Sequence, residues 1–187
     1  MLHIRDEERE FSLRTAKLAL SEYLDRGVVP GCETDAPGLL QQRATFVTLR
    51  RRDTGELRGC RGECRPVRPL IESVIAHTIF AATDDPRFAP VRPEEVPDLT
   101  IRISALGLLQ PSRPDEIVLG RHGLVLIRGR RSGLLLPEVP VHFGLKTPGE
   151  FLDALFRKAR LPKAEPWQGD LELYSFETEF WGDEDVP

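Results

Sequence analysis

The sequence lacks long apolar runs and an even set of cysteines, and its opening residues do not resemble a leader peptide. No segment holds about 18 consecutive apolar residues, which a membrane-spanning helix requires. The opening MLHIRDEERE is too acidic and too polar for a secretory signal. Three cysteines are an odd number, which argues against the disulfide framework of a small secreted protein. We therefore expect a cytoplasmic protein without a membrane span.

Aromatic residues are scarce, and the net charge is not positive. Phe, Trp and Tyr make up 7% of the chain, and the formal net charge is −4. Charge is unevenly spread, because seven arginines lie between residues 50 and 68 while the segment from residue 170 onward has seven acids and no base. Overall acidity and the absence of aromatics between residues 50 and 68 disfavour nucleic-acid binding. These arginines either attract a small anionic ligand or form solvated surface.

Apolar residues recur at helical spacing in three segments, which are expected to form helices over residues 6–27, 69–82 and 147–159. We expect Asp6 to cap the first helix and Gly27 to close it. Pro69 suits the first position of the second helix. Thr147-Pro148-Gly149-Glu150 is a capping box that opens the third. His77 is in phase with apolar residues of the second helix, which predicts a partly buried, hydrogen-bonded histidine.

Alternation of apolar and polar residues predicts antiparallel strands. A hairpin is expected around a turn at residues 52–55, followed by a half-buried strand over residues 99–106 and a second hairpin around residues 129–133. Both arms of the second hairpin are apolar, so we expect the pair to be central in its sheet. A final strand over residues 171–181 loses its apolar parity between Leu173 and Tyr174, which suggests either a bulge or a strand with both faces partly covered.

Helices mixed with hairpins favour an α+β fold with mainly antiparallel pairing over a doubly wound sheet. We expect one domain over residues 1–187 with two unequal lobes. The larger lobe is expected to hold both termini and an antiparallel sheet flanked by helices. A smaller lobe is expected within about residues 28–97, which contain prolines and glycines that interrupt secondary structure and all three cysteines.

The motif LRGCRG at residues 57–62 is the main candidate for chemistry, and a metal site is its first possible role. Cys60 and Cys64 have the spacing C-x3-C, while zinc knuckles begin with a closer pair and need two further ligands. The histidines are scattered, and an iron–sulfur motif lacks its other cysteines. We therefore predict no metal site.

A reactive thiol is the second possible role of the motif. Arg58 and Arg61 flank Cys60, and nearby positive charge lowers a thiol pKa. A nucleophile also needs a base, for which His122 and His142 are candidates. The alternative is that Cys60 is a small apolar residue buried in a strand.

An anion-binding loop is the third possible role. Gly59 and Gly62 allow close backbone approach, and their N–H groups could form an anion-binding nest. The Arg58 guanidinium could bind a carboxylate or phosphate with two hydrogen bonds. The motif lacks the lysine and hydroxyl of a Walker loop and is no Rossmann fingerprint, so no cofactor is predicted. Arg87, in the segment ATDDPRFAPV, either pairs with a neighbouring carboxylate to pin its loop or lies at the rim of the site.

Six segments in order resemble the AMMECR domain family over about residues 10–181: LRGCRG, FAATDDPRFAPV, LTIRISAL, GRHGLVLIRGRRSGLLLPEV, FLDALFRKARLP and LYSFETEFW. The family motif is usually Leu-Arg-Gly-Cys-Ile-Gly, so Arg61 replaces its isoleucine. The resemblance implies an α+β fold with two unequal lobes. It also implies that the motif is the functional surface, and it assigns no catalytic role to Cys60.

Small prokaryotic members of that family are similar to protein A of the three-part AmmeMemoRadiSam system. The resemblance thus implies two partners, a Memo-like protein and a radical S-adenosylmethionine enzyme. Our leading hypothesis is that the protein binds a small anionic ligand or a modified partner loop at Arg58, Gly59, Arg61 and Gly62, with Cys60 as the catalytic thiol and with Arg87 and His122 at the rim. The rival hypothesis is a non-enzymatic interaction or scaffold module, with nucleic-acid binding through the arginine-rich residues 50–68 as its less favoured form, so enzyme activity stays open.

Overall fold

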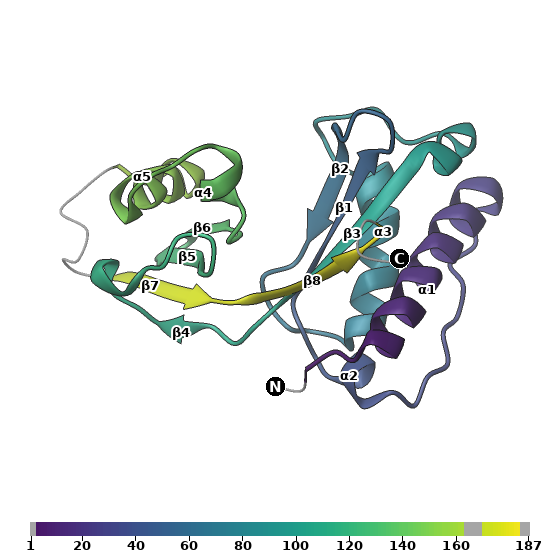
Figure 1. Cartoon of the computed structure of the whole chain (residues 1–187), viewed down its shortest axis with the longest axis horizontal. Coiled ribbons are helices and arrows are strands. Elements are labelled where there is room, and N and C mark those ends of the chain that lie inside the picture. Colours follow the sequence, from purple (N-terminus) through teal and green to yellow (C-terminus); the bar gives the residue numbers. More distant parts are fainter. Residues whose placement is uncertain (1–2, 163–169, 184–187) are drawn as a thin grey trace. The chain divides into compact units, whose positions relative to one another are not determined.

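The computed structural model describes residues 3–162 and 170–183 and shows an α+β fold (Figure 1). The chain forms two compact units: unit 1 comprises Met1–Leu106 with Glu179–Pro187, and unit 2 comprises Gly107–Thr178. The expected smaller lobe at about residues 28–97 differs from this division, because the hairpin of residues 45–62 pairs with the strand of residues 99–106 in one sheet of unit 1.

Unit 1 is built on a sheet with the strand order β2-β1-β3-β8. The strands are β1 (Thr45–Arg51), β2 (Leu57–Gly62), β3 (Leu99–Leu106) and β8 (Thr178–Gly182). Two long helices, α1 (Asp6–Arg26) and α3 (Leu70–Thr83), cover one face of this sheet (Figure 1). Val47, Leu49 and Ile103 point to that face and are fully buried, as their alternation predicts. We call the opposite side of the sheet the outer face.

Short helices complete unit 1: α2 (Pro37–Leu40) between α1 and β1, and the 3-10 helix η1 (Pro93–Asp98) before β3. Gly27 closes α1 in the left-handed conformation, as expected, but the starts of α1 and α3 differ by one residue from the expected ones. Arg5 is the N-cap of α1 and its N–H donates to Glu8 at 2.9 Å, so Asp6 is the first helical residue. Pro69 is the N-cap of α3 rather than its first residue. Across the described residues, no helix is both long and apolar enough to cross a membrane.

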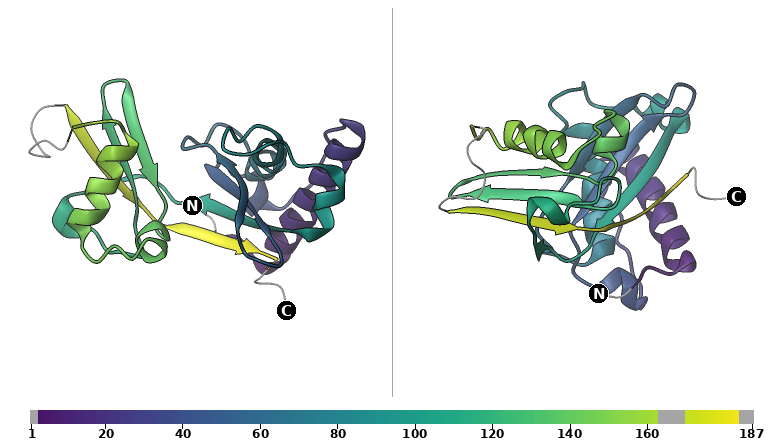
Figure 2. Two further views of the ribbon diagram at one scale, coloured as in Figure 1. Left: turned by 90° about the horizontal axis from the view of Figure 1, so that it is seen from above. Right: turned by 60° about the vertical axis from the view of Figure 1, so that its left-hand side comes forward.

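Unit 2 has a second sheet, of order β4-β7-β5-β6. Its strands are β4 (Gln110–Pro111), β5 (Gly123–Arg128), β6 (Arg131–Leu135) and β7 (Leu171–Phe176), and its helices are η2 (Pro114–Glu116), α4 (Val139–His142) and α5 (Pro148–Lys158). Helix α5 lies on one face of the sheet and buries Phe151 and Leu155 there (Figure 2). The capping box is confirmed, since Glu150 N–H donates to Thr147 Oγ1 at 3.2 Å.

Two strand predictions need correction. Of the second hairpin, β5 is central, but β6 is an edge strand, because only β5 pairs with it. The final segment is no single bulged strand. It divides at Glu177 into β7 and β8, which belong to different sheets. The lost parity lies within β7, where pairing with β5 is continuous and shows no bulge; Leu173 and Phe176 are both buried although they lie on opposite faces, so both faces of β7 are covered.

Candidate functional site

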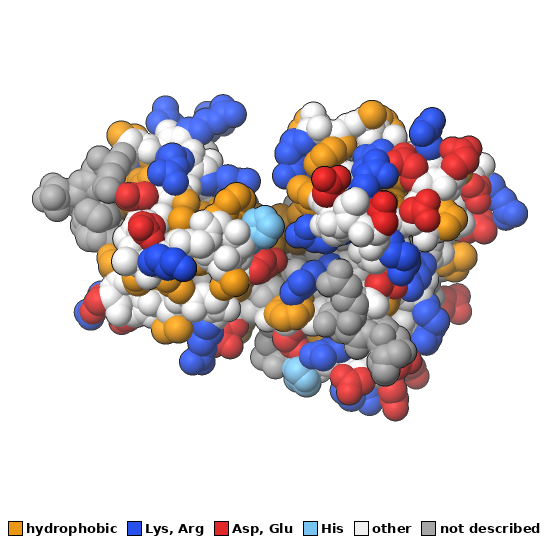
Figure 3. All heavy atoms as spheres, turned by 45° about the horizontal axis from the view of Figure 1, so that its top comes forward, with side chains coloured by type: hydrophobic (Ala, Val, Ile, Leu, Met, Phe, Trp, Pro, Cys, Tyr) orange, Lys and Arg blue, Asp and Glu red, His pale blue; other side chains and the backbone are white. Residues whose placement is uncertain are grey.

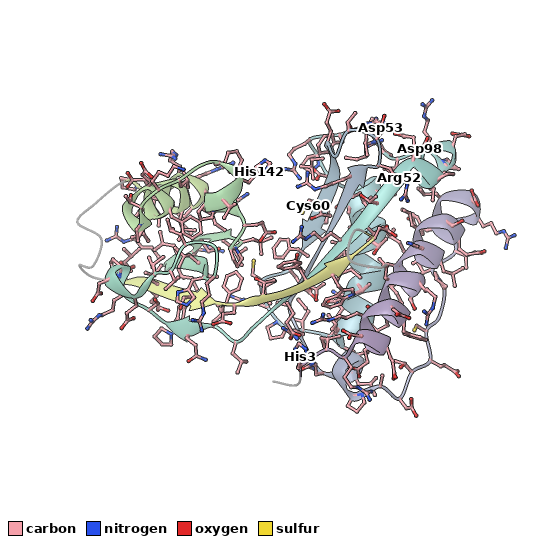
Figure 4. The ribbon with its side chains drawn as sticks, in the orientation of Figure 1. His3, Arg52, Asp53, Cys60, Asp98 and His142 are labelled. Carbon is pink, nitrogen blue, oxygen red and sulfur yellow. The ribbon has the colours of Figure 1, made fainter. Side chains whose placement is uncertain are left out.

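The LRGCRG motif forms strand β2 at the edge of the unit 1 sheet, with Cys60 within it (Figure 4). Strand β2 pairs only with β1, so that Cys60 lies opposite Thr48 and Gly59 opposite Leu49. Side chains of a strand alternate between faces. Residues 59 and 61 therefore point toward α3, and residues 60 and 62 toward the outer face. The register shift between Leu49 and Arg50 interrupts this alternation at Arg58.

The two glycines of the motif permit close packing. A Cβ atom on Gly59 would overlap the carbonyl oxygen of Ala81 in α3, and one on Gly62 would overlap the ring of Phe46. Both glycines lie in strand β2, and neither has a positive φ. Their role in the structure is to let α3 and β1 approach β2, in place of the expected anion-binding nest.

Arg58 is buried and its guanidinium is engaged within the protein. Its Nε and Nη2 donate to the two carboxylate oxygens of Glu95, each at 3.0 Å, and Nη1 and Nη2 donate to the carbonyls of Ala89 and Pro90 at 2.9 and 3.3 Å. The hydrogen bonds from Arg58 lower the pKa of Glu95 to about 2. The fork that the sequence suggested for an external anion thus ties β2 to the segment before β3.

Asp85 takes the central position beside the motif. Its buried carboxylate accepts the N–H of Cys60 at 2.9 Å and two guanidinium bonds from Arg87, at 2.9 and 2.6 Å. The bonds from Arg87, followed by that from Cys60, hold the pKa of Asp85 far below its usual range. The expected pairing of Arg87 with a neighbouring carboxylate is confirmed, and it fixes the loop after α3 to the free edge of β2.

Arg87 interacts electrostatically with the Cys60 thiol. The pKa of Arg87 is raised mainly by its hydrogen bonds to Asp85, with a further electrostatic contribution from Cys60. The Cys60 thiol itself is partly exposed and accepts a hydrogen bond from Thr48 Oγ1 at 3.3 Å. Since the Arg87 side chain is 55% exposed, its guanidinium is anchored at one side and open to solvent at the other.

The α3 side of β2 carries a second polar group of residues. The Ser73 hydroxyl bonds to Glu63, and Arg68 lies 3.6 Å from the same carboxylate. His77 is buried with its Nε2 3.7 Å from Glu63, and neither ring nitrogen has a hydrogen-bond partner, contrary to the satisfied histidine that we expected. Burial lowers the pKa of His77.

The remaining candidates lie apart in the chain. Arg61, which replaces the family isoleucine, is 40% exposed and pairs with Asp84 at 3.1 Å. His122 belongs to unit 2, where its Nδ1 accepts the N–H of Val118 at 3.2 Å. The structure therefore gathers residues 58–62 with Arg87 in unit 1. Within the described part of the chain, no three metal-binding side chains are grouped as metal ligands would be.

Sequence reasoning missed Thr48 and the position of Asp85. Thr48 was visible only as a polar residue in an alternating strand, and no local signal tied it to Cys60. Charges are also less segregated than the arginine count suggested. Figure 3 shows Lys and Arg side chains interspersed with Asp and Glu over one face of the molecule. Six of the seven arginines between residues 50 and 68 contact a carboxylate or a backbone carbonyl.

Comparison with known proteins agrees with the motif and the fold. The AMMECR1 family model matches residues 13–181. A protein of Thermococcus gammatolerans is 41% identical over 98% of this chain and 94% of its own length, and protein MK0488 of Methanopyrus kandleri is 40% identical over 96% and 90%. The crystal structure of uncharacterized protein PH0010 from Pyrococcus horikoshii superposes with a TM-score of 0.89 at 38% identity, covering 97% of this chain and 94% of that one.

Proposed function

The chain belongs to the AMMECR1 family, and on that premise we propose that it binds a small anionic ligand, or a modified loop of a partner protein, beside Cys60. One observation carries the proposal. Arg87 is anchored on buried Asp85, lies near the partly exposed Cys60 thiol, and keeps more than half of its side chain accessible. A fixed guanidinium with free N–H groups is suited to a carboxylate or phosphate.

Cys60 has two features that favour a chemical role over simple packing. Thr48 donates a hydrogen bond to its sulfur, and Arg87 places positive charge nearby. Both interactions stabilise a thiolate more than a thiol. We propose that the thiolate contacts the ligand and that Arg87 neutralises the ligand's charge.

The edge of β2 favours a compact ligand over an added strand. A free sheet edge can bind an extended peptide through its backbone groups. Here Asp85 already accepts the N–H of Cys60, and Arg58 bonds to the carbonyls of Ala89 and Pro90 beside it. A partner protein would therefore offer a loop or a modified side chain.

The proposed setting follows from the family resemblance. The protein would work with a Memo-like protein and a radical S-adenosylmethionine enzyme, either as an enzyme or as a module that presents the ligand. Affinity purification of the tagged protein from its own cells, followed by mass spectrometry of proteins and small molecules, tests this setting. If neither partner is recovered, the proposed role in the three-part system is wrong. Binding that requires nucleic acid and falls steeply with salt would instead support the nucleic-acid-binding form of the rival hypothesis.

Alkylation kinetics test the site itself. In a Cys32→Ser, Cys64→Ser background, the rate of iodoacetamide reaction as a function of pH gives the apparent pKa of Cys60. We expect Arg87→Gln to raise this pKa, and Arg92→Gln, whose side chain is 79% exposed and lies on Glu95, to leave it unchanged. An ordinary thiol pKa in the parent, together with full ligand and partner binding by Cys60→Ala, would eliminate the thiol role.

A further inference from the structure

A second polar cluster lies on the outer face of the unit 1 sheet, next to Cys60 but on the inner strands. In the register of β1 and β3, Thr48 faces Arg102 and Arg50 faces Thr100. All four side chains point to the same face, so two guanidiniums occupy one diagonal of a square and two hydroxyls the other. We call these four residues the Thr/Arg square.

A hollow opens between these side chains. It has a volume of about 20 Å³ and is lined by the Thr/Arg square together with Gly182 and Asp183. Gly182 belongs to β8, and a Cβ atom there would come within 2.5 Å of the carbonyl oxygen of Ile101. The glycine therefore lets β8 pack closely against the backbone of β3 beside Arg102. A volume of this size holds one oxygen atom, since a buried water needs roughly 10–15 Å³.

The two arginines of the square are not neutralised by carboxylates. Among the described residues, Arg50 bonds only to the carbonyl of Gly55, at 2.8 Å, and its guanidinium makes no ion pair. The guanidinium of Arg102 stacks over the ring of Phe180, 4.1 Å from its centroid, and its buried Nε has no hydrogen-bond partner. Stacking on a ring leaves the in-plane N–H groups of a guanidinium available.

The one acid at the hollow is already compensated. Asp183 accepts the N–H of Ile101 at 2.8 Å and forms an ion pair with Lys17. Like charges on diagonal positions of a sheet repel one another unless a counter-charge lies between them. An anion at the mouth of the hollow would relieve this repulsion and satisfy Arg102 Nε.

We propose that the Thr/Arg square binds a phosphate group, with one oxygen in the hollow and the others toward the two guanidiniums. A phosphate carries up to two negative charges near pH 7 and matches two guanidiniums in charge. Thr48 donates to Cys60 Sγ and also lines the hollow, so a phosphorylated ligand held there would lie beside the thiol. The inference rests on the proposed function in that the ligand is anionic, but it does not require the thiol.

Isothermal titration of the full chain with inorganic phosphate, in a low-salt buffer at pH 7.5, tests the site. We expect saturable one-site binding that Arg102→Gln and Arg50→Gln each weaken by about tenfold or more, because each removes charge-assisted hydrogen bonds. Arg102→Lys should weaken it less. Arg65→Gln, which removes the same charge from an exposed position outside the square, should change the affinity less than twofold.

The outcomes separate this inference from the proposed function. Phosphate binding that survives Cys60→Ser supports the square independently of any thiol role. If Arg65→Gln and Arg102→Gln weaken phosphate binding equally, the loss of affinity reflects net charge alone, and the inference is overturned. Absence of saturable phosphate binding, in protein whose circular dichroism shows it folded, would also overturn it and leave the Arg87 site untouched. Acetate serves as a comparison anion, and binding as tight as that of phosphate would contradict a site for phosphate.

Discussion

The backbone N–H of Cys60 donates a hydrogen bond of 2.9 Å to Oδ2 of Asp85, a residue 25 positions later in the chain. The same carboxylate holds the Arg87 guanidinium. One buried acid therefore fixes the edge strand, the loop after α3 and the cation near the thiol. The geometry of the site depends on this acid more than on any residue of the motif itself.

Asp85→Asn is expected to destabilise the protein by about 2 kcal/mol, because an amide cannot replace the charge-assisted bonds of the carboxylate. The neighbouring Asp84→Asn is the matched control. Asp84 is 65% exposed and its pair with Arg61 should contribute less than about 1 kcal/mol. Urea denaturation followed by circular dichroism measures both. Equal stabilities for the two variants would contradict the anchoring role of Asp85.

The Arg58–Glu95 pair predicts a large effect of removing one partner. Arg58→Gln should cost about 3 kcal/mol of unfolding free energy, since it leaves a largely buried carboxylate without its bidentate partner. Arg51 lies 3.5 Å from the same carboxylate and its side chain is 44% exposed, so Arg51→Gln should cost less than about 1 kcal/mol.

The Arg58–Glu95 pair also predicts that the free energy of unfolding depends on pH. The pKa of Glu95 is lowered on folding, so its contribution is present above the unfolded value of about 4.5 and disappears as the pH falls toward about 2.

Gly59→Ala tests the close approach of α3 to β2. The added methyl group overlaps the backbone carbonyl of Ala81, which cannot move without shifting the helix. We expect a loss of about 2 kcal/mol or more in stability and a changed environment for Cys60. At Gly31 a Cβ atom meets nothing within 4 Å, so Gly31→Ala should be close to neutral in the same denaturation experiment. A tolerated Gly59→Ala would mean that α3 does not press on the strand.

His77 predicts a loss of stability on mild acidification. Its pKa is lowered in the folded protein by burial, while Glu63 raises it and Arg68 and Arg61 lower it further. Below the unfolded pKa of about 6.5, the unfolded chain binds a proton that the folded chain does not, so the free energy of unfolding falls as the pH falls. The loss ends once the pH passes below the folded pKa.

Melting temperatures of the parent and of His77→Gln between pH 8 and pH 5 measure this effect. We expect the parent to lose more stability than the variant over that interval. His142→Gln removes an exposed histidine and should follow the parent. Identical pH profiles for the parent and His77→Gln would show that the histidine takes up its proton freely in the folded state.

The local structure was largely predictable because it is encoded in short-range patterns. The strands around residues 52–55 and the strand at residues 99–106 follow from alternation, and α5 begins at its capping box. The errors lie where neighbours in space decide. The division of the last segment into β7 and β8 depends on two different sheets, which the sequence of that segment alone does not reveal.

The sequence predicted which residues belong to the site, but it did not predict which of them bond to one another. Arg58 was the expected cation for Cys60, since the two are close in sequence. In the structure Arg58 is bonded to Glu95, and Arg87 lies near the thiol through its bond to Asp85. Nothing in the spacing of these residues distinguishes one arrangement from the other.

The family, the α+β class and the motif that becomes the edge strand can all be inferred from the chain alone, because composition, periodicity and an ordered set of motifs are properties of the chain. Which charges meet is a property of the folded molecule. Hydrogen bonds and ion pairs depend on distances of a few ångströms between residues that are remote along the chain, and those distances exist only after β1, β2, β3 and α3 have packed together.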